Sequence, residues 1–298
     1  MTNQQKAYIY AAFAVLLWST AASAFKISLR YLDFLHLLLF SSFFASLVLF
    51  IFLVIQKKFN LIFSFSRKEY LHSLFLGFLN PFLYYLILFK AYELLPAQEA
   101  QPLNFIWPLM IVLFSIPILK QKIKFKNIIS LLICFLGVII ISTQGNIFSL
   151  KFSNSFGVGL ALFSSIIWAF FFILNVKDKR DEIVKLFLSF IFGFFYILIF
   201  SFVFVKIDFP SIKGILGTIY ISLFEMAITF FVWLKALTLS DTTAKVNNLI
   251  YLTPFLSLIF INFMVGEKIL LSTFIGLIFI VTGILSSSEL VPKPENIR

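Results

Sequence analysis

Ten long apolar segments follow one another along the chain, and they decide what it can fold into. A transmembrane helix needs about 20 mostly apolar residues. The segments are 8–27, 34–55, 70–92, 97–118, 125–143, 156–176, 184–205, 214–238, 242–264 and 269–287. Strands of a membrane β-barrel would alternate in polarity and would be about half as long. The sequence therefore predicts an all-α integral membrane protein with ten transmembrane helices.

Charged residues are few, and the basic ones gather in the loops on one side. Only 12% of the residues are charged, against about a quarter in a soluble domain. The basic clusters on the side of the N-terminus are Lys57, Lys58, Arg67 and Lys68; Lys120, Lys122, Lys124 and Lys126; and Lys177, Lys179, Arg180 and Lys185. The positive-inside rule then predicts a multi-pass protein of the inner or plasma membrane with both termini and the tail 288–298 in the cytoplasm. These loops account for the net charge of +11, so no nucleic-acid partner is expected.

The chain repeats itself, which indicates a duplicated membrane domain. Lys90-Ala91 recurs 145 residues later as Lys235-Ala236, and Trp18 recurs 150 residues later as Trp168. The two copies are 8–143 and 156–287. Each holds five predicted helices, and because five is odd the second copy must be inverted relative to the first. Inverted repeats are typical of alternating-access transporters, whose binding site lies between the copies near the bilayer midplane.

Polar residues inside the apolar segments mark the candidate site. A polar group within the bilayer is costly and usually faces a cavity or another polar group. The repeat sets Asn80 opposite Glu225, and the polar face of the fourth segment opposite that of the ninth. The candidate substrate-binding residues are Trp18, Asn80, Gln98, Gln101, Asn104, Trp107, Trp168, Glu225, Lys245, Asn248 and Tyr251. The expected location is between the third, fourth, eighth and ninth helices.

Structural explanations stay open for several of these residues. The two asparagines of the polar faces, Asn104 and Asn248, are also suited to joining helices by hydrogen bonds. Glu225 has either a ligand or proton role or a purely structural ion pair with Lys245. The tryptophans are explained either as cavity walls or as ordinary packing. We expect Glu99, near the end of its segment, to be solvated.

The residues that an enzyme or a cofactor site would need are missing from the sequence. No glycine-rich phosphate-binding loop, metal-ligand spacing or arrangement of Ser, His and Asp for hydrolysis is present. The single cysteine, Cys134, lies in an apolar run and has no partner for an internal disulfide. We therefore expect no cofactor, no metal and no enzymatic activity, and a substrate that is a small molecule.

Together these motifs resemble the drug/metabolite transporter superfamily in its ten-helix EamA-type branch, over residues 8–288. The motifs are Trp18 and Trp168, Lys90-Ala91 and Lys235-Ala236, Pro108 and Pro254, and Gly266-Glu267-Lys268. The first copy departs from the pattern because Lys120-Gln121-Lys122 replaces the Gly-Glu-Lys motif, which we interpret as a changed capping turn. Asn104-Phe105-Ile106-Trp107-Pro108 is similar to the Asn-x-x-Trp-Pro segment of aromatic amino-acid exporters.

The resemblance implies a function and leaves alternatives. It implies a secondary transporter that exports amino acids or related amphipathic compounds, with helices five and ten at the periphery, where they would form a homodimer. An amino acid would find an ammonium partner in Glu225 and a carboxylate partner in Lys245 and the asparagine amides. The alternatives are an uptake carrier for a solute such as S-adenosylmethionine, a membrane-embedded lipid-modifying enzyme, and a structural or receptor-like protein. The lipid-modifying enzyme is disfavoured because its catalytic cluster would lie near a membrane interface, whereas the polar residues here lie near the midplane. The structural protein is disfavoured because a structural bundle needs no polar centre repeated in both halves.

Overall fold

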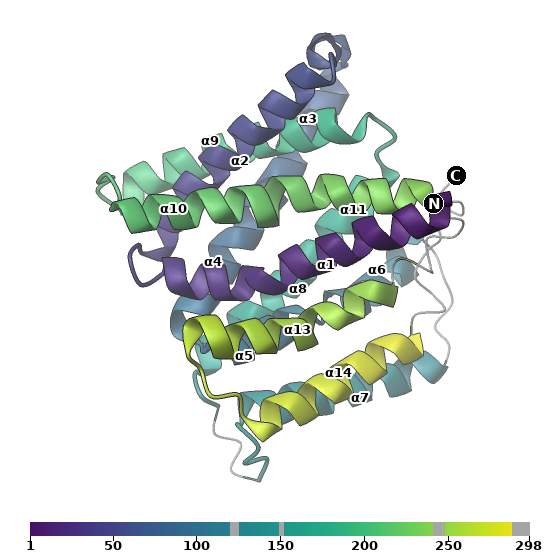
Figure 1. Ribbon diagram of the computed structural model, residues 1–298, viewed down its shortest axis with the longest axis vertical. Coiled ribbons are helices and arrows are strands. Elements are labelled where there is room, and N and C mark those ends of the chain that lie inside the picture. The colour runs from purple at the N-terminus through teal and green to yellow at the C-terminus, as the bar shows by residue number, and fades with distance from the viewer. Residues whose placement is uncertain (120–124, 149–151, 241–245, 247, 288–298) are drawn as a thin grey trace.

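The computed structural model describes residues 1–119, 125–148, 152–240, 246 and 248–287, and all statements on structure concern these residues. Every regular element in them is a helix (Figure 1). This confirms the predicted fold class, an all-helical membrane protein. The predicted tail 288–298 and the start of the ninth predicted helix lie outside the described residues.

The first repeat contains long helices and one helix broken at its centre. Its elements are α1 (Asn3–Ser28), α2 (Phe34–Ile55), η1 (Phe59–Ser64), α3 (Arg67–Gly77), η2 (Phe78–Leu83), α4 (Tyr84–Leu94), α5 (Ala97–Asn104), α6 (Trp107–Leu119) and α7 (Phe125–Ser142). The π turn η2 joins α3 and α4 into one membrane-length span, Arg67–Leu94. The predicted helix 97–118 is instead divided into α5 and α6. Pro108 at the second position of α6 has no N–H to continue the hydrogen-bond ladder of α5.

The second repeat again has two long helices, a span broken by a π turn, a divided fourth segment and a final helix. It contains α8 (Ser155–Lys177), α9 (Glu182–Phe204), α10 (Ile212–Ile221), η3 (Ser222–Ala227), α11 (Ile228–Leu239), η4 (Asn248–Leu252), α13 (Thr253–Phe260), η5 (Ile261–Val265) and α14 (Leu271–Ser287). Here η3 is again a π turn, and it joins α10 and α11 into the span Ile212–Leu239.

The second repeat is inverted relative to the first, as the sequence predicts. Lys58, just after α2, forms an ion pair of 2.7 Å with Asp181, which lies between α8 and α9. Since α2 returns the chain to the end of the bundle where α1 begins, α8 must end where α1 begins. The two opening helices therefore run in opposite directions.

Side chains before each helix explain where several of the helices begin. Asp33 accepts hydrogen bonds from the backbone N–H groups of Leu35 and His36 at the start of α2. Asp181 caps α9 in the same way, and Ser66 caps α3. Capping satisfies N–H groups that have no partner within the helix. These caps fix the short turns that connect antiparallel neighbours.

The helices pack with α1 at the centre and the last helix of each repeat at one edge. Figure 1 shows α1 between α11 and α13, with α7 and α14 side by side at one edge of the bundle. Gly137 on α7 and Gly276 on α14 bring these two backbones together, since a Cβ atom on Gly276 would lie 2.8 Å from the Gly137 carbonyl oxygen. Small residues allow such close approach between transmembrane helices.

Candidate functional site

Two π turns break the central helices of the two repeats at equivalent positions. Asn80 lies in η2 and Glu225 lies in η3, 145 residues apart. Asn80 has an extended backbone (φ −149°, ψ 120°) in the middle of the helix. The following Pro81 explains this, because proline disfavours the α conformation in the residue before it and supplies no N–H. Such π turns inside helices are frequent at functional sites.

Helix α9 packs against the break at Asn80 through two glycines. A Cβ atom on Gly193 would lie 2.4 Å from Cδ of Pro81 and 2.8 Å from the carbonyl oxygen of Gly77. A Cβ atom on Gly77 would lie 2.4 Å from the carbonyl oxygen of Ser189. Ser189 and Gly193 are four residues apart, so they form one small-residue face of α9. This face holds the broken helix at its kink.

The Asn80 side chain is fully buried beside this packing. Its amide nitrogen and its amide oxygen have no hydrogen-bond partner among the described residues. Buried polar groups without partners are rare and call for an explanation. A binding role for the kink would explain why both Asn80 side-chain atoms lack a partner.

Hydrogen bonds connect Glu225 and Asn104 to neighbouring tyrosines. The hydroxyl of Tyr85 donates to a carboxylate oxygen of Glu225 at 3.2 Å. The hydroxyl of Tyr84 donates to the amide oxygen of Asn104 at 3.4 Å, and the Asn104 amide nitrogen donates to Ser164 at 2.8 Å. Glu225 and Ser164 belong to the second repeat, and the other three residues belong to the first. The two repeats therefore meet at these polar groups.

An aromatic cluster joins the two predicted tryptophans beside these hydrogen bonds. The ring of Phe230 lies 5.6 Å from Trp18 and 5.7 Å from Trp168, centroid to centroid. Trp168 also lies 4.9 Å from Tyr84 and 6.5 Å from Trp107. Trp18, Trp107, Trp168 and Phe230 are all only partly buried. The structure thus brings Trp18, Trp107 and Trp168 into one aromatic cluster.

Three residues at this centre were not among the sequence candidates. Tyr84 and Tyr85 follow the kink by one helical turn, and Phe230 occupies the position of Tyr85 in the second repeat, 145 residues on. Their signal in the sequence is an adjacent pair of tyrosines close to an intramembrane Asn-Pro. Aromatic residues are common throughout this chain, so the pair did not stand out.

Gln98 lies apart from the other candidates, and its side-chain amide is hydrogen-bonded to the second repeat. Its amide nitrogen donates to the Lys268 carbonyl oxygen at 2.9 Å. Its amide oxygen accepts from the Leu270 N–H at 2.8 Å and from the Thr273 hydroxyl at 3.2 Å. The predicted continuous polar face of the fourth helix is therefore divided between a turn at the bundle end and the centre.

The remaining candidates are placed only in part. The side-chain oxygen of Gln101 is buried without a partner among the described residues. Tyr251 lies in η4 and is partly buried against the main apolar core. Asn248 begins η4, but its side chain lies outside what the structure describes, as does all of Lys245.

Glu99 is buried, so the expectation that it is solvated is wrong. None of its surface is exposed. Gln144 donates to one carboxylate oxygen at 2.8 Å, and the Ser153 hydroxyl donates to the other. The loop between α7 and α8 therefore covers the beginning of α5, a long-range contact that the position of Glu99 in its own segment does not reveal.

Glu267 of the Gly-Glu-Lys motif caps a helix of the other repeat. Its two carboxylate oxygens accept from the N–H groups of Ala97 (2.8 Å) and Gln98 (3.0 Å) at the start of α5. A carboxylate is favourable at a helix N-terminus because the exposed N–H groups carry partial positive charge. Gly266 has a φ of 81°, a left-handed conformation that favours glycine. The corresponding segment of the first repeat, 120–122, lies outside the described residues.

The site contains one carboxylate, amide groups and aromatic rings, which suits binding rather than covalent chemistry. No group of three or more His, Cys, Asp or Glu side chains able to hold a metal ion occurs in the described part of the chain. Glu225 is partly exposed, whereas Tyr85 behind it is fully buried. The arrangement presents a carboxylate oxygen next to aromatic surfaces.

Comparison with known proteins relates these features to membrane transporters. A sequence model of the EamA-like transporter family matches residues 5–143 and 155–288. An uncharacterized transporter of Archaeoglobus fulgidus is 24% identical over 283 residues, which are 94% of this chain and 96% of that protein. The uncharacterized transporter YyaM of Bacillus subtilis is 23% identical over 238 residues, covering 77% of this chain and 76% of that protein.

A solved structure supports the same fold over the full length. It superposes with a TM-score of 0.66 at 20% sequence identity, and the match covers 96% of this chain and 98% of the other. At this identity the likeness concerns the fold alone.

Proposed function

The chain belongs to the EamA-like transporter family, and on this premise we propose that it exports amino acids or related amphipathic compounds. It is a multi-pass membrane transporter of a small molecule and not an enzyme. The proposed mechanism is alternating access, in which the two inverted repeats move against each other around a central site. The proposed orientation has both termini in the cytoplasm.

The hydrogen bond between Glu225 and Tyr85, whose ring lies 4.7 Å from that of Tyr84 in the aromatic cluster, carries this proposal. A carboxylate beside aromatic faces suits an ammonium group, which is attracted by the negative charge and by the electron-rich rings. The same rings suit an aromatic or thioether side chain. We propose that Glu225 binds the amino group, while Trp18, Trp168 and Phe230 contact the apolar part of the substrate.

The carboxylate end of the substrate is assigned from the sequence. We propose that Lys245 and Asn248 bind it, because the sequence predicts a shared polar face for them in the segment 242–264. In the described state the Asn104 amide is bonded to Tyr84 and Ser164. It therefore orients the site from the first repeat.

The two π turns supply a means of movement. Each lies at the centre of a span, where a helix with an irregular hydrogen-bond ladder bends most readily. At one end of the bundle, Glu267 caps α5 and Arg30 donates to the Val265 carbonyl oxygen at 2.7 Å. We propose that these contacts between repeats separate when the site opens toward that end.

We further propose that Glu225 exchanges a proton during the cycle, which would couple export to the proton gradient. A carboxylate that alternates between substrate and proton makes the two compete for one site. The test is transport into inside-out vesicles at several pH values, for the wild type, Glu225→Gln and Glu225→Asp. Unchanged transport rate and pH dependence in Glu225→Gln would refute the proton role.

The substrate is tested by ligand-dependent stability of the purified protein in detergent. A ligand that binds only the folded state raises the melting temperature, by an amount that grows with its concentration over Kd. We expect a shift with aromatic or sulfur-containing amino acids that is lost in Glu225→Gln and retained in Tyr8→Phe, an exposed residue outside the site. A shift with S-adenosylmethionine alone would instead favour the uptake alternative and contradict the amino-acid proposal.

A further inference from the structure

A basic depression lies at the end of the bundle where α3 begins and α8 ends. It is lined by Lys68, Glu69, His72, Lys177, Asp178, Lys179 and Arg180, and its volume is about 500 Å³. The first three residues belong to α3 of the first repeat, and the other four belong to the end of α8 and the turn that follows it in the second. Four cationic side chains therefore face two carboxylates.

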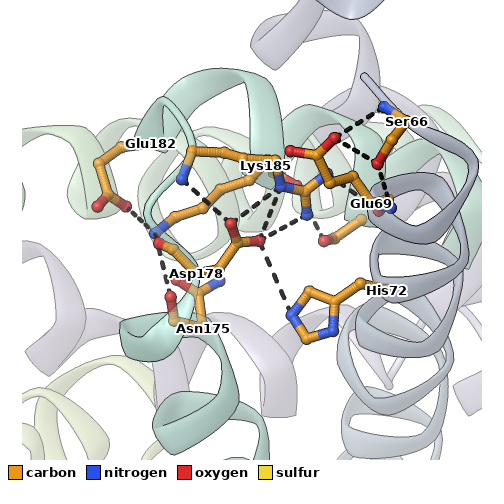
Figure 2. Close-up of polar contacts among 9 residues, drawn as sticks. Ser66, Glu69, His72, Asn175, Asp178, Glu182 and Lys185 are labelled. Atoms are coloured by element: carbon orange, nitrogen blue, oxygen red, sulfur yellow. Dashed lines mark hydrogen bonds and ion pairs between the residues drawn. The ribbon is translucent and has the colours of Figure 1, made fainter. Parts of the chain in front are cut away.

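A buried ion pair holds the floor of the basic depression in place. Arg180 donates from Nε and Nη2 to the Asp178 carboxylate at 2.9 and 2.5 Å, and both side chains are at most 7% exposed. Arg180 also donates from Nη1 to the Glu69 carbonyl oxygen at 3.0 Å, which joins the turn to α3. Figure 2 shows Asp178 also facing His72, whose Nε2 lies 3.8 Å from it. The two walls are thus fixed to each other.

Behind this floor, Lys185 is almost completely buried. It donates to the carbonyl oxygens of Asn175 (3.1 Å) and Asp178 (3.0 Å), and it pairs with the Glu182 carboxylate at 2.9 Å (Figure 2). These bonds close the turn between α8 and α9. The turn is therefore held by hydrogen bonds, and Arg180 within it reaches the backbone of α3.

Three acidic groups of this region are already matched by cations of their own, and the Glu69 carboxylate accepts hydrogen bonds from Ser66. Asp178 pairs with Arg180, Glu182 pairs with Lys185, and Asp181 pairs with Lys58. Lys68 and Lys179, by contrast, are exposed and have no acidic side chain within 4.0 Å in the part of the chain that the structure describes. The rim of the basic depression therefore carries two lysines without an acidic partner against one such carboxylate, Glu69, so its net charge is positive.

The apolar surface of α3 begins directly next to this rim. Leu71, Leu74 and Phe75 are 56%, 39% and 45% exposed, and they follow Lys68 within two helical turns. The membrane-length span that contains them starts at Arg67. The basic depression therefore lies at headgroup level, with an acyl-chain surface beside it.

We propose that the basic depression binds the phosphate-bearing headgroup of an anionic phospholipid, with Lys68 and Lys179 as its phosphate ligands. Lysines at a membrane surface attract anionic lipids, and the exposed face of α3 covers the acyl chains. Because the headgroup contacts one wall from each repeat, bound lipid stabilises the arrangement in which these walls meet. This site is separate from the transported substrate and does not depend on its identity.

The test measures lipid binding to the full-length protein in detergent by native mass spectrometry. The probes are dioleoyl-phosphatidylglycerol, dioleoyl-phosphatidylcholine and inorganic phosphate. The variant is Lys68→Gln/Lys179→Gln. Its matched control is Lys206→Gln/Lys213→Gln, which removes the same charge from exposed lysines at the opposite end of the bundle.

We expect the wild type to prefer phosphatidylglycerol and the Lys68/Lys179 variant to bind it about 25-fold more weakly, at roughly fivefold per lysine. The control variant should bind like the wild type. Equal loss in both variants would mean that overall charge attracts the lipid, which overturns the proposal. Equal binding of the two lipids also overturns it, and displacement of phosphatidylglycerol by inorganic phosphate would identify a free-phosphate site instead.

Discussion

The packing of α9 on the broken helix predicts that adding a single methyl group will be destabilising. In Gly193→Ala the new Cβ atom would lie 2.4 Å from Cδ of Pro81, 2.6 Å from its Cγ and 2.8 Å from the Gly77 carbonyl oxygen. None of these atoms belongs to a side chain that rotates away, because two are in a proline ring and one is backbone. Helix α9 must therefore move away from the kink.

The expected cost follows from two opposing effects. Overpacking of this kind costs about 1–3 kcal/mol, and three contacts below 3.0 Å favour the upper end. Replacing glycine by alanine inside a helix returns about 1 kcal/mol of intrinsic helix stability. We expect Gly193→Ala to lower the free energy of unfolding by about 2 kcal/mol.

The chain offers a matched control for this substitution. Gly159 lies in α8 of the same repeat, and a Cβ atom there would meet no atom within 4 Å. Gly159→Ala should therefore gain up to about 1 kcal/mol. The assay is unfolding of both variants by SDS in mixed micelles, followed by tryptophan fluorescence and far-UV circular dichroism.

Either of two results would refute this reasoning. If both alanine variants change the unfolding free energy equally, the loss does not come from the contact with Pro81. If Gly193→Ala is as stable as the wild type, α9 does not hold the kink by close approach. The same variant should also slow transport, because α9 positions the Asn80 kink.

Three further predictions concern polar contacts. Tyr85→Phe removes the hydrogen bond to Glu225 and should change the pH dependence of transport in vesicles. Expression and the circular dichroism spectrum should stay unchanged, and an unaltered pH profile would contradict a role for this contact. Glu267→Gln removes the charge that caps α5 and should lower the unfolding free energy by about 1–2 kcal/mol, measured in the same SDS titration. Burial alone would raise the pKa of Asp178, but its hydrogen bonds and ion pair with Arg180 hold the pKa below the ordinary value, so the pair should stabilise the fold above about pH 4. This stability should disappear as the pH falls through the depressed pKa, and Asp178→Asn should make the acid sensitivity smaller.

Part of the site could be predicted because the duplication marks equivalent positions. Trp18 and Trp168 are repeat partners, and the structure places both against Phe230. The offset of 145 residues between Lys90 and Lys235 also pairs Asn80 with Glu225, and both lie in π turns. The Asn80-Pro81 pair also predicts the kink, since proline restricts the backbone of the residue that precedes it.

Other parts of the site required contacts between segments far apart in the chain. The bond from Tyr85 to Glu225 joins residues 140 positions apart, and the capping of α5 by Glu267 joins residues 170 apart. Periodicity within one helix places a side chain on a face but does not say which helix that face meets. For this reason Gln98 was grouped with Asn104, although it bonds to the turn before α14.

The sequence by itself determined the membrane-spanning elements, their duplication and the inversion of the second repeat. These follow from local physics, because apolar length decides what crosses a bilayer and an odd number of crossings reverses direction. The tertiary structure alone decided that Glu99 is buried, that α9 clamps the kink, and that a basic depression forms between α3 and the turn after α8. Each of these depends on side chains from two distant segments meeting in space, which no property of either segment alone specifies.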